Sequence, residues 1–197
     1  MNQKLSDDAL NLLFREARSY NAYRPEPISD TDIEAIWELV KMGPTSANQL
    51  PARLIWVRTQ EGRERLAQTV SDKNRPKILS APVSVIVGMD TDFHLHLPEL
   101  FPHIDAKSWF QHDAELRYSS AFRNSSLQGA YLILAARALG FDTGPISGFD
   151  HEAVDQAFFA DTPNVRANFI TTLGHGDPSS VFGRLPRPEF AKFNRLA

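Results

Sequence analysis

Apolar residues recur at helical spacing in the first forty residues and predict two helices there. Ser6 is placed to cap a first helix that runs to about Tyr20. Ser29 is placed to cap a second helix, with Asp32 at the capping-box position, and this helix ends at Gly43-Pro44. The apolar stripes are Leu10, Leu13, Phe14 and Ala17 in the first helix and Ile33, Ile36, Trp37 and Val40 in the second. Each helix is therefore expected to bury one face.

Runs of β-branched residues predict a small sheet further along the chain. The expected strands are 53–59, 82–89 and 168–173, and further helices are expected at 61–70 and 150–159. The unbroken apolar run of 82–89 indicates a strand buried on both faces. Residues 91–117 predict one or two short helices with a mobile segment. Helices outnumber about four strands, which predicts an α+β fold, an α/β sandwich, in a single domain over residues 1–197.

A long, nearly all-apolar helix is predicted from Ala121 to Leu139. Such a helix is expected to be buried on all sides. It is shorter than the roughly 18 residues that a bilayer requires and it contains Arg137, so a core helix is favoured over a membrane span. Gly140 suits the end of the helix. The following residues 142–150 contain two glycines and a proline, which fits either a helix–loop–strand joint or a backbone that approaches a flat ligand.

Composition excludes several classes of protein. The net charge of −3 argues against a nucleic-acid partner. The absence of cysteine excludes disulfides, thiolate nucleophiles and cysteine-ligated metals. The six histidines lack a metal-ligand spacing, and no Walker A, G-x-G-x-x-G or G-x-S-x-G motif is present. With a polar N-terminus that resembles no targeting peptide, these features predict a cytoplasmic protein without metal, membrane or nucleic acid.

Three basic clusters remain as candidate chemistry: Arg18 with Arg24, residues 73–77, and Arg184 with Arg187. Each alone is typical of a solvated face. Together they could hold an anion, because the planar guanidinium group pairs bidentately with phosphate oxygens.

Five short motifs occur in an order that resembles the FMN-dependent nitroreductase family. They are Arg18-Ser19, Pro44-Thr45-Ser46-Ala47-Asn48, Asn74 with Lys77, the stretch from Leu139 to Asp150, and Leu185-Pro186-Arg187. The resemblance covers nearly the whole chain. Within the family, the stretches around 43–48, 100–110, 121–126 and 142–150 are most similar to the branch that contains the malonic semialdehyde reductase of bacterial uracil degradation.

The resemblance implies a fold, an assembly and a reaction. The fold is a small mixed sheet surrounded by helices, with a long central helix at a dimer interface. The assembly is a homodimer with two FMN molecules between the subunits. In the implied ping-pong reaction, NADH or NADPH reduces FMN and leaves, and an acceptor then enters the same pocket.

The resemblance also implies roles for individual residues. Those at the FMN phosphate are Arg18, Ser19, Arg184 and Arg187, and Asn21 stands where many relatives have Arg or Lys. Those at the ribityl chain and the N1/O2 edge of the ring are Asn74 and Lys77. Those over one ring face are Pro145, Ile146, Ser147 and Gly148, and those reaching the pyrimidine end from the partner subunit are Thr45, Ser46 and Asn48. Arg24 could supply the cation missing at Asn21, and Leu50 and Ala52 replace the usual Gln and Trp of the family.

Three functions stay open from the sequence. The first is reduction of a small aldehyde acid such as malonic semialdehyde to 3-hydroxypropanoate, with a cation for its carboxylate. The candidate cations are Lys107, Arg117 and Arg123, each also explained as a surface charge. The second is reduction of nitroaromatics or quinones, with ring stacking on aromatic residues that could equally be core: Phe93, Phe101, Trp109 and Phe110. The third is a flavin-binding protein without turnover.

Overall fold

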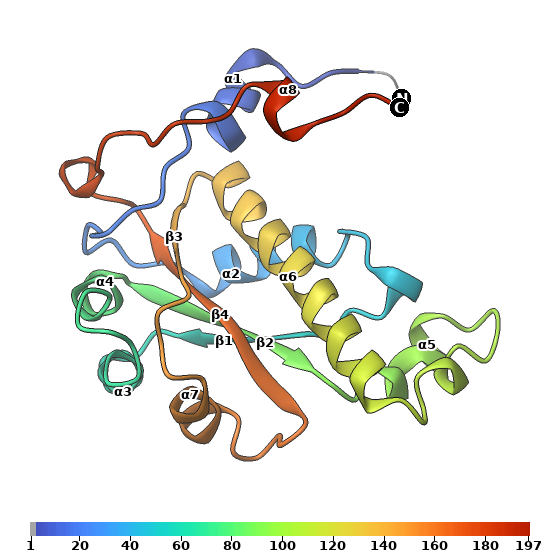
Figure 1. Cartoon of the computed structure of the whole chain (residues 1–197). Helices are drawn as coiled ribbons and strands as arrows, with labels where there is room; N and C mark the ends of the chain where they lie inside the picture. Colours follow the sequence, from blue (N-terminus) through green and yellow to red (C-terminus); the bar gives the residue numbers. More distant parts are fainter. Residues whose placement is uncertain (1–2) are drawn as a thin grey trace.

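One four-stranded sheet forms the centre of the computed structural model, which describes residues 3–197 (Figure 1). The strands are β1 (Ala52–Val57), β2 (Val83–Asp90), β3 (Asp142–Ile146) and β4 (Val165–Gly174), in the order β1-β2-β4-β3. Every neighbouring pair of these strands is antiparallel. The expectation of a mixed sheet is therefore wrong. The parallel pairing is an isolated bridge between Ser19 and Thr143, outside the named strands.

Helices cover both faces of the sheet (Figure 1). The helices are α2 (Asp30–Val40) and α6 (Ala114–Ala138) on one face, and α3 (Gln60–Ala67), α4 (Arg75–Ser80) and α7 (His151–Phe158) on the other. In β2, Val85 and Val87 pack in the core with α2 and α6, while Ile86 packs in the opposite core. Burial of this strand on both faces and the α+β sandwich are thus confirmed.

The second helix begins as the sequence predicts. The Ser29 Oγ accepts the Asp32 N–H at 3.1 Å, and the Asp32 Oδ2 accepts the Ser29 N–H at 3.0 Å. These bonds satisfy backbone donors that a helix start leaves free, so the capping box fixes where α2 begins. Its Ile36 and Val40 are fully buried, whereas Trp37 is half-exposed.

The first helix is shorter than predicted. α1 (Asp7–Leu10) passes into a π-helical turn (Asn11–Arg15) and does not reach Tyr20. Beyond it the chain is extended along the sheet edge, where the Tyr20 N–H donates to the Thr143 carbonyl at 3.1 Å. Pairing with β3 satisfies the backbone groups that a longer helix would have satisfied internally.

The long helix α6 differs from its prediction in extent and in burial. It begins at Ala114, where the capping Asp113 side chain accepts the Leu116 N–H, well before the predicted Ala121. Its buried face includes polar residues: Ser120, Asn124, Ser125 and Gln128. Phe122 and Leu127 are exposed, so burial on all sides is wrong for the single chain.

The glycine-proline segment after α6 forms the edge strand β3. Gly140 ends the helix with a φ of +83°, a left-handed conformation that favours glycine. Pro145 is tolerated because an edge strand need not donate from every residue. The stretch therefore forms a joint between helix and strand, as the first of the two expectations has it, and an approach of its backbone to a flat ligand stays a prediction.

The remaining elements are short. They are 3₁₀ turns at Ser46–Asn48, Phe93–His96, Lys107–Trp109 and Pro178–Ser180, with helices α5 (Leu97–Leu100) and α8 (Phe190–Phe193). Residues 91–117 contain short helical pieces as predicted and pack into a separate small core. Across residues 3–197, no helix is long and apolar enough to cross a bilayer, and no three His, Asp or Glu side chains group as metal ligands.

Candidate functional site

A cavity of about 600 Å³ lies between the segment after α1 and the C-terminal segment. Its lining brings together the four residues predicted at the FMN phosphate, and with them Asn21: Arg18, Ser19, Asn21, Arg184 and Arg187. Arg137 of α6 also lines it, which the sequence analysis did not assign to the site. No carboxylate side chain is among the lining residues. The cavity thus presents four guanidinium groups and suits an anion.

Hydrogen bonds join the two segments that form this cavity. The Arg18 Nη2 donates to the Phe182 carbonyl, and the Arg184 Nη2 donates to the Ala17 carbonyl at 3.1 Å. The Asn21 Nδ2 donates to the Ser180 carbonyl at 3.0 Å. Asn21 therefore holds the C-terminal segment in place with its amide.

Arg24 does not supply the cation missing at position 21. It is exposed, its Nη1 lies 3.3 Å from the Glu26 Oε1, and it is not among the residues lining the cavity. The proposed substitution of Arg24 for that cation is not supported. The cavity receives a further cation from Arg137 instead, out of a distant part of the chain.

Lys77 lies on the same sheet edge, next to the chain that leaves the cavity. Ser19 bridges to Thr143, and the next residue of β3, Gly144, lies against the Lys77 side chain: a Cβ added to Gly144 would be 2.3 Å from the Lys77 Cε. The Lys77 residue is 7% exposed, and burial lowers its pKa to about 8. Within the part of the chain that the structure describes, no carboxylate lies within 4.0 Å of its Nζ.

Asn74, the residue before α4, is bonded to the end of the glycine-proline segment. Its Nδ2 donates to the Ser71 Oγ at 3.1 Å and to the Gly148 carbonyl at 3.2 Å. The Ser71 N–H donates to the same carbonyl at 3.1 Å. Pro145, Ser147 and Gly148 are exposed beside this link.

Ile146 does not present its side chain at this surface. It is 3% exposed and packs in the core formed with α3, α4 and α7. Of the four residues predicted to cover a ring face, Ile146 can therefore contribute only backbone atoms.

The structure does not bring Thr45, Ser46 and Asn48 to the other predicted site residues. Their loop leads into β1, at the opposite edge of the sheet from β3, across three strand spacings of about 4.8 Å each. The Ser46 N–H donates to the Asn124 Oδ1 at 2.8 Å, and the Asn48 Nδ2 donates to the Leu100 carbonyl at 2.8 Å. Within one chain this loop is therefore hydrogen-bonded to α6 and α5.

The loop has a constrained backbone. Ala47, Asn48 and Leu50 have φ values of 48°, 49° and 40°, in the left-handed region that residues other than glycine rarely occupy. Such conformations persist only where surrounding contacts enforce them. Here Gln49 is fully buried, and its Nε2 donates to the Ser46 carbonyl at 3.0 Å and to the Ser120 Oγ at 3.1 Å.

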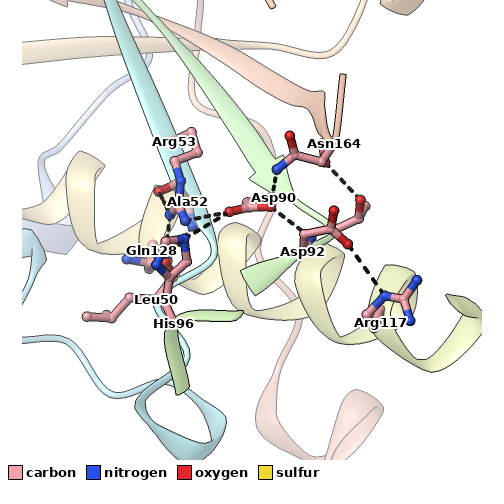
Figure 2. Close-up of polar contacts among 10 residues, drawn as sticks. Leu50, Ala52, Arg53, Asp90, Asp92, His96, Arg117, Gln128 and Asn164 are labelled. Carbon is pink, nitrogen blue, oxygen red and sulfur yellow. Dashed lines mark hydrogen bonds and ion pairs between the residues drawn. The ribbon is translucent and has the colours of Figure 1, made fainter. Parts of the chain in front are cut away.

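A buried carboxylate, that of Asp90, supports the loop through Arg53 (Figure 2). The Arg53 Nη1 donates to the Leu50 carbonyl at 3.1 Å, and the Arg53 Nη2 lies 2.5 Å from the Asp90 Oδ2. The Asp90 Oδ1 accepts the Asn164 Nδ2 at 2.7 Å and the Asp92 N–H at 2.8 Å. Asp90 at the end of β2 therefore holds Arg53, and Arg53 holds the loop.

The residues predicted to bind the substrate that accepts the hydride lie in and beside the segment 91–117. Arg117 already donates to the Phe110 carbonyl at 3.0 Å, and its Nε lies 3.8 Å from the Asp92 Oδ1. Phe93 and Phe110 are buried and meet edge to face at 5.0 Å, so they are core. Trp109 is 50% exposed and remains available for stacking.

Over residues 14–175, the sequence matches the model of the nitroreductase family. The chain belongs to the nitroreductase family. It is 54% identical over 192 residues to a candidate NADH dehydrogenase/NAD(P)H nitroreductase of Burkholderia lata, covering 98% of each chain. It is 50% identical over 197 residues to a protein of Stenotrophomonas maltophilia with the same description, covering 100% of each chain.

Solved structures share the fold. A candidate nitroreductase from Exiguobacterium sibiricum, solved in complex with FMN, has a TM-score of 0.87 at 20% identity and full coverage of both chains. The nitroreductase-type protein YdfN of Bacillus subtilis has a TM-score of 0.85 at 22% identity, covering 98% of this nitroreductase and 100% of YdfN. At these identities the likeness concerns the fold alone.

Family membership confirms the predicted fold and the predicted class, an NAD(P)H-dependent oxidoreductase of nitroreductase type. The predicted cofactor, FMN, is the one used in the family. Neither of the two sequence relatives is named for malonic semialdehyde, so the narrower branch stays a prediction.

Proposed function

We propose that this nitroreductase forms a homodimer with two FMN sites, each made from both subunits. The arginine cavity, Lys77 and residues 145–148 of one subunit form the larger part of each site. Thr45, Ser46 and Asn48 of the partner subunit complete it. The observation that carries this proposal is a cavity lined by four arginines and no carboxylate, on one edge of the sheet. Next to it is a buried lysine that has no ion pair among residues 3–197.

The residues fit a flavin mononucleotide. A phosphate monoester is a dianion near pH 7, and the cavity offers guanidinium groups without competing carboxylates. Lys77 lies on α4, against Gly144 of β3, where its ammonium group would match the negative charge on the edge of the flavin ring. Gly148 lies close to Asn74, and a Cβ at this position would lie only 3.1 Å from the Asn74 Nδ2.

The dimer explains two features that the single chain leaves unexplained. Loop 45–50 is held rigidly although it faces no site of its own chain. Large apolar side chains are also exposed on α6 and on the C-terminal segment: Phe122, Leu127, Phe182, Leu185, Phe190 and Phe193. Exposed apolar surface of this extent is typical of an interface between proteins.

Bound FMN supplies the chemistry, accepting a hydride from NADH or NADPH and passing it to an acceptor. The protein contributes position and charge. With a pKa of about 8, Lys77 is mostly protonated at pH 7 and stabilises negative charge on the ring edge in a water-poor site. The anchored carbonyl of Gly148 fixes the backbone over one ring face.

We propose a small aldehyde acid as the acceptor, with malonic semialdehyde as the compound to test. The sequence stretches shared with that branch support it. Lys107 and Arg123 could bind the carboxylate, because no carboxylate lies within 4.0 Å of either in the described residues 3–197. Exposed Trp109 favours a second candidate, a nitroaromatic or quinone stacked on its ring.

Assays on the purified protein test this function. FMN added to the protein should stay bound to it through purification. NADH or NADPH, added without oxygen, should then bleach the absorbance of the bound FMN. Steady-state rates with malonic semialdehyde, a nitroaromatic and a quinone should then differ, with the aldehyde reduced fastest. Comparable weak rates on all three would contradict the aldehyde acid as the acceptor. Bound FMN that neither nucleotide bleaches would favour a flavin-binding protein without turnover.

A further inference from the structure

Arg137 is placed unusually for a residue of the core helix. It lies in the last turn of α6, yet it lines the arginine cavity formed by the segments 17–21 and 182–187. One guanidinium nitrogen, Nη1, donates to the Leu13 carbonyl at 3.0 Å. No carboxylate lies within 4.0 Å of the Arg137 nitrogens in the part of the chain covered by the structure. The group has further N–H donors, since a guanidinium carries five.

A partly buried cation without an ion pair is costly for the folded protein. Arg137 is half-buried, and burial lowers its pKa, opposed by the more distant charge of Asp142. The C-terminal segment is exposed at Arg184 and Arg187, where solvation offsets the cost of the charge. An anion bound in the cavity would remove the cost at Arg137.

A second cavity of about 200 Å³ shows on which side an anion would bind. Arg137 lines this cavity together with Glu16 and Asp142, whose carboxylates disfavour an anion there. The Asp142 Oδ2 also accepts the Gly176 N–H at 2.9 Å. The larger cavity has no acid, so an anion at Arg137 is favoured only from the larger cavity.

We propose that Arg137 is a phosphate-binding residue of the flavin site. Arg137 adds a cation to the cavity, where position 21 is an uncharged Asn. The Asn21 amide is already bonded to the Ser180 carbonyl. Being on a long core helix, it is fixed before the ligand arrives, whereas Arg184 and Arg187 lie on an exposed segment. This inference rests on the proposed function, and it adds a phosphate-binding side chain from α6 to the site.

The test compares FMN with riboflavin, which lacks the phosphate. Full-length protein freed of flavin is titrated with each by fluorescence quenching, as wild type, Arg137→Gln, Arg137→Lys and Arg166→Gln. Arg137→Gln should weaken FMN binding by about tenfold to a hundredfold, as for loss of a charge-assisted hydrogen bond. Riboflavin binding should change by less than about twofold, and Arg137→Lys should be intermediate.

Arg166→Gln is the control for the loss of one positive charge. Arg166 is exposed, it pairs with Asp155, and it lies at the start of β4, far along a ten-residue strand from the cavity. It should leave both affinities unchanged. The effect of Arg137→Gln should also persist at high salt, while that of Arg187→Gln should shrink, because salt screens exposed charges more than buried ones.

The outcomes separate this inference from the function it rests on. Equal losses for FMN and riboflavin in Arg137→Gln would mean that Arg137 only anchors Leu13, and would overturn the inference. An unchanged FMN affinity would overturn it as well, while leaving the flavin site intact. A wild-type protein that binds neither flavin would overturn the proposed function itself and the inference with it.

Discussion

Lys77 lowers the stability of the folded protein, and it is also a residue of the proposed flavin site. Its ammonium group is buried against Gly144 without an ion pair in the described residues, and burial lowers its pKa to about 8. The unfolded chain binds this proton more tightly than the folded chain. Stability therefore rises as the pH passes from about 8 toward the ordinary lysine pKa of about 10.4, and below pH 8 the buried charge costs free energy.

Replacing Lys77 by Met should stabilise the flavin-free protein while impairing its site. We expect a gain on the order of 2 kcal/mol near pH 7, because the buried charge is removed and the aliphatic stem is kept. Thermal unfolding at pH 7, 8.5 and 10 checks this, and the gain should shrink as the pH rises. Hydride transfer from NADH, followed by stopped flow, should slow more than FMN affinity falls. A gain independent of pH would contradict the assigned cause.

Gly144 should tolerate no larger side chain, because it is the surface on which Lys77 lies. A Cβ would come within 2.3 Å of the Lys77 Cε and 2.5 Å of the Tyr20 carbonyl oxygen, which is backbone and cannot move aside. Gly144→Ala should cost about 1–3 kcal/mol in urea unfolding. Gly183→Ala is the matched control: no atom lies within 4 Å of its Cβ, so the change should stay within about 0.5 kcal/mol.

Residue identity predicted part of the site. Motif order alone singled out Arg18, Arg184 and Arg187, and the structure places all three on one cavity. Arg137 was missed because the pattern marked it only as a charge within an apolar helix. Its position follows from where α6 ends relative to the C-terminal segment, and that is a tertiary relation which periodicity does not encode.

At the scale of elements, the sequence predicted features that depend on near neighbours better than the pairing of distant segments. The capping box of α2 and the doubly buried β2 depend on near neighbours and on side-chain pattern, and both were confirmed. The end of the first helix was wrong because residues 19–23 pair with distant segments, at Thr143 and Gly176. The early start of α6 follows from the Asp113 cap. The polar buried face of α6 meets loop 45–50, where the Ser46 N–H donates to the Asn124 Oδ1.

Loop 45–50 is held through the Asp90–Arg53 pair, and its loss should weaken the site from a distance (Figure 2). Asp90→Asn should destabilise the protein by about 1–3 kcal/mol, because Arg53 loses its charge partner. It should lower the affinities for FMN and riboflavin by the same factor, since the loop is proposed to touch the ring and not the phosphate. Fluorescence titration and urea unfolding measure both effects.

The control for Asp90→Asn is Asp161→Asn, at an exposed residue for which the structure shows no ion pair within residues 3–197. It should leave stability and both affinities unchanged. A loss confined to FMN in Asp90→Asn would contradict the role of the loop at the ring.

At the scale of the whole molecule, the single chain keeps the two proposed parts of the flavin site apart. The arginine cavity and Lys77 lie beside β3, and loop 45–50 leads into β1 at the other edge. The sequence resemblance predicted this division between subunits. No periodicity could have done so, because it depends on the order of the strands and on a second copy of the chain.

A mixed dimer tests that division most directly. Arg18→Glu disables the cavity and Ser46→Glu disables the loop, so neither homodimer should retain FMN. In a heterodimer of the two variants, one site combines both lesions, and the other combines the intact cavity of one subunit with the intact loop of its partner. Native mass spectrometry of the purified heterodimer should find one FMN per dimer. A heterodimer that retains no FMN, although wild-type dimers retain two, would contradict a site shared between subunits.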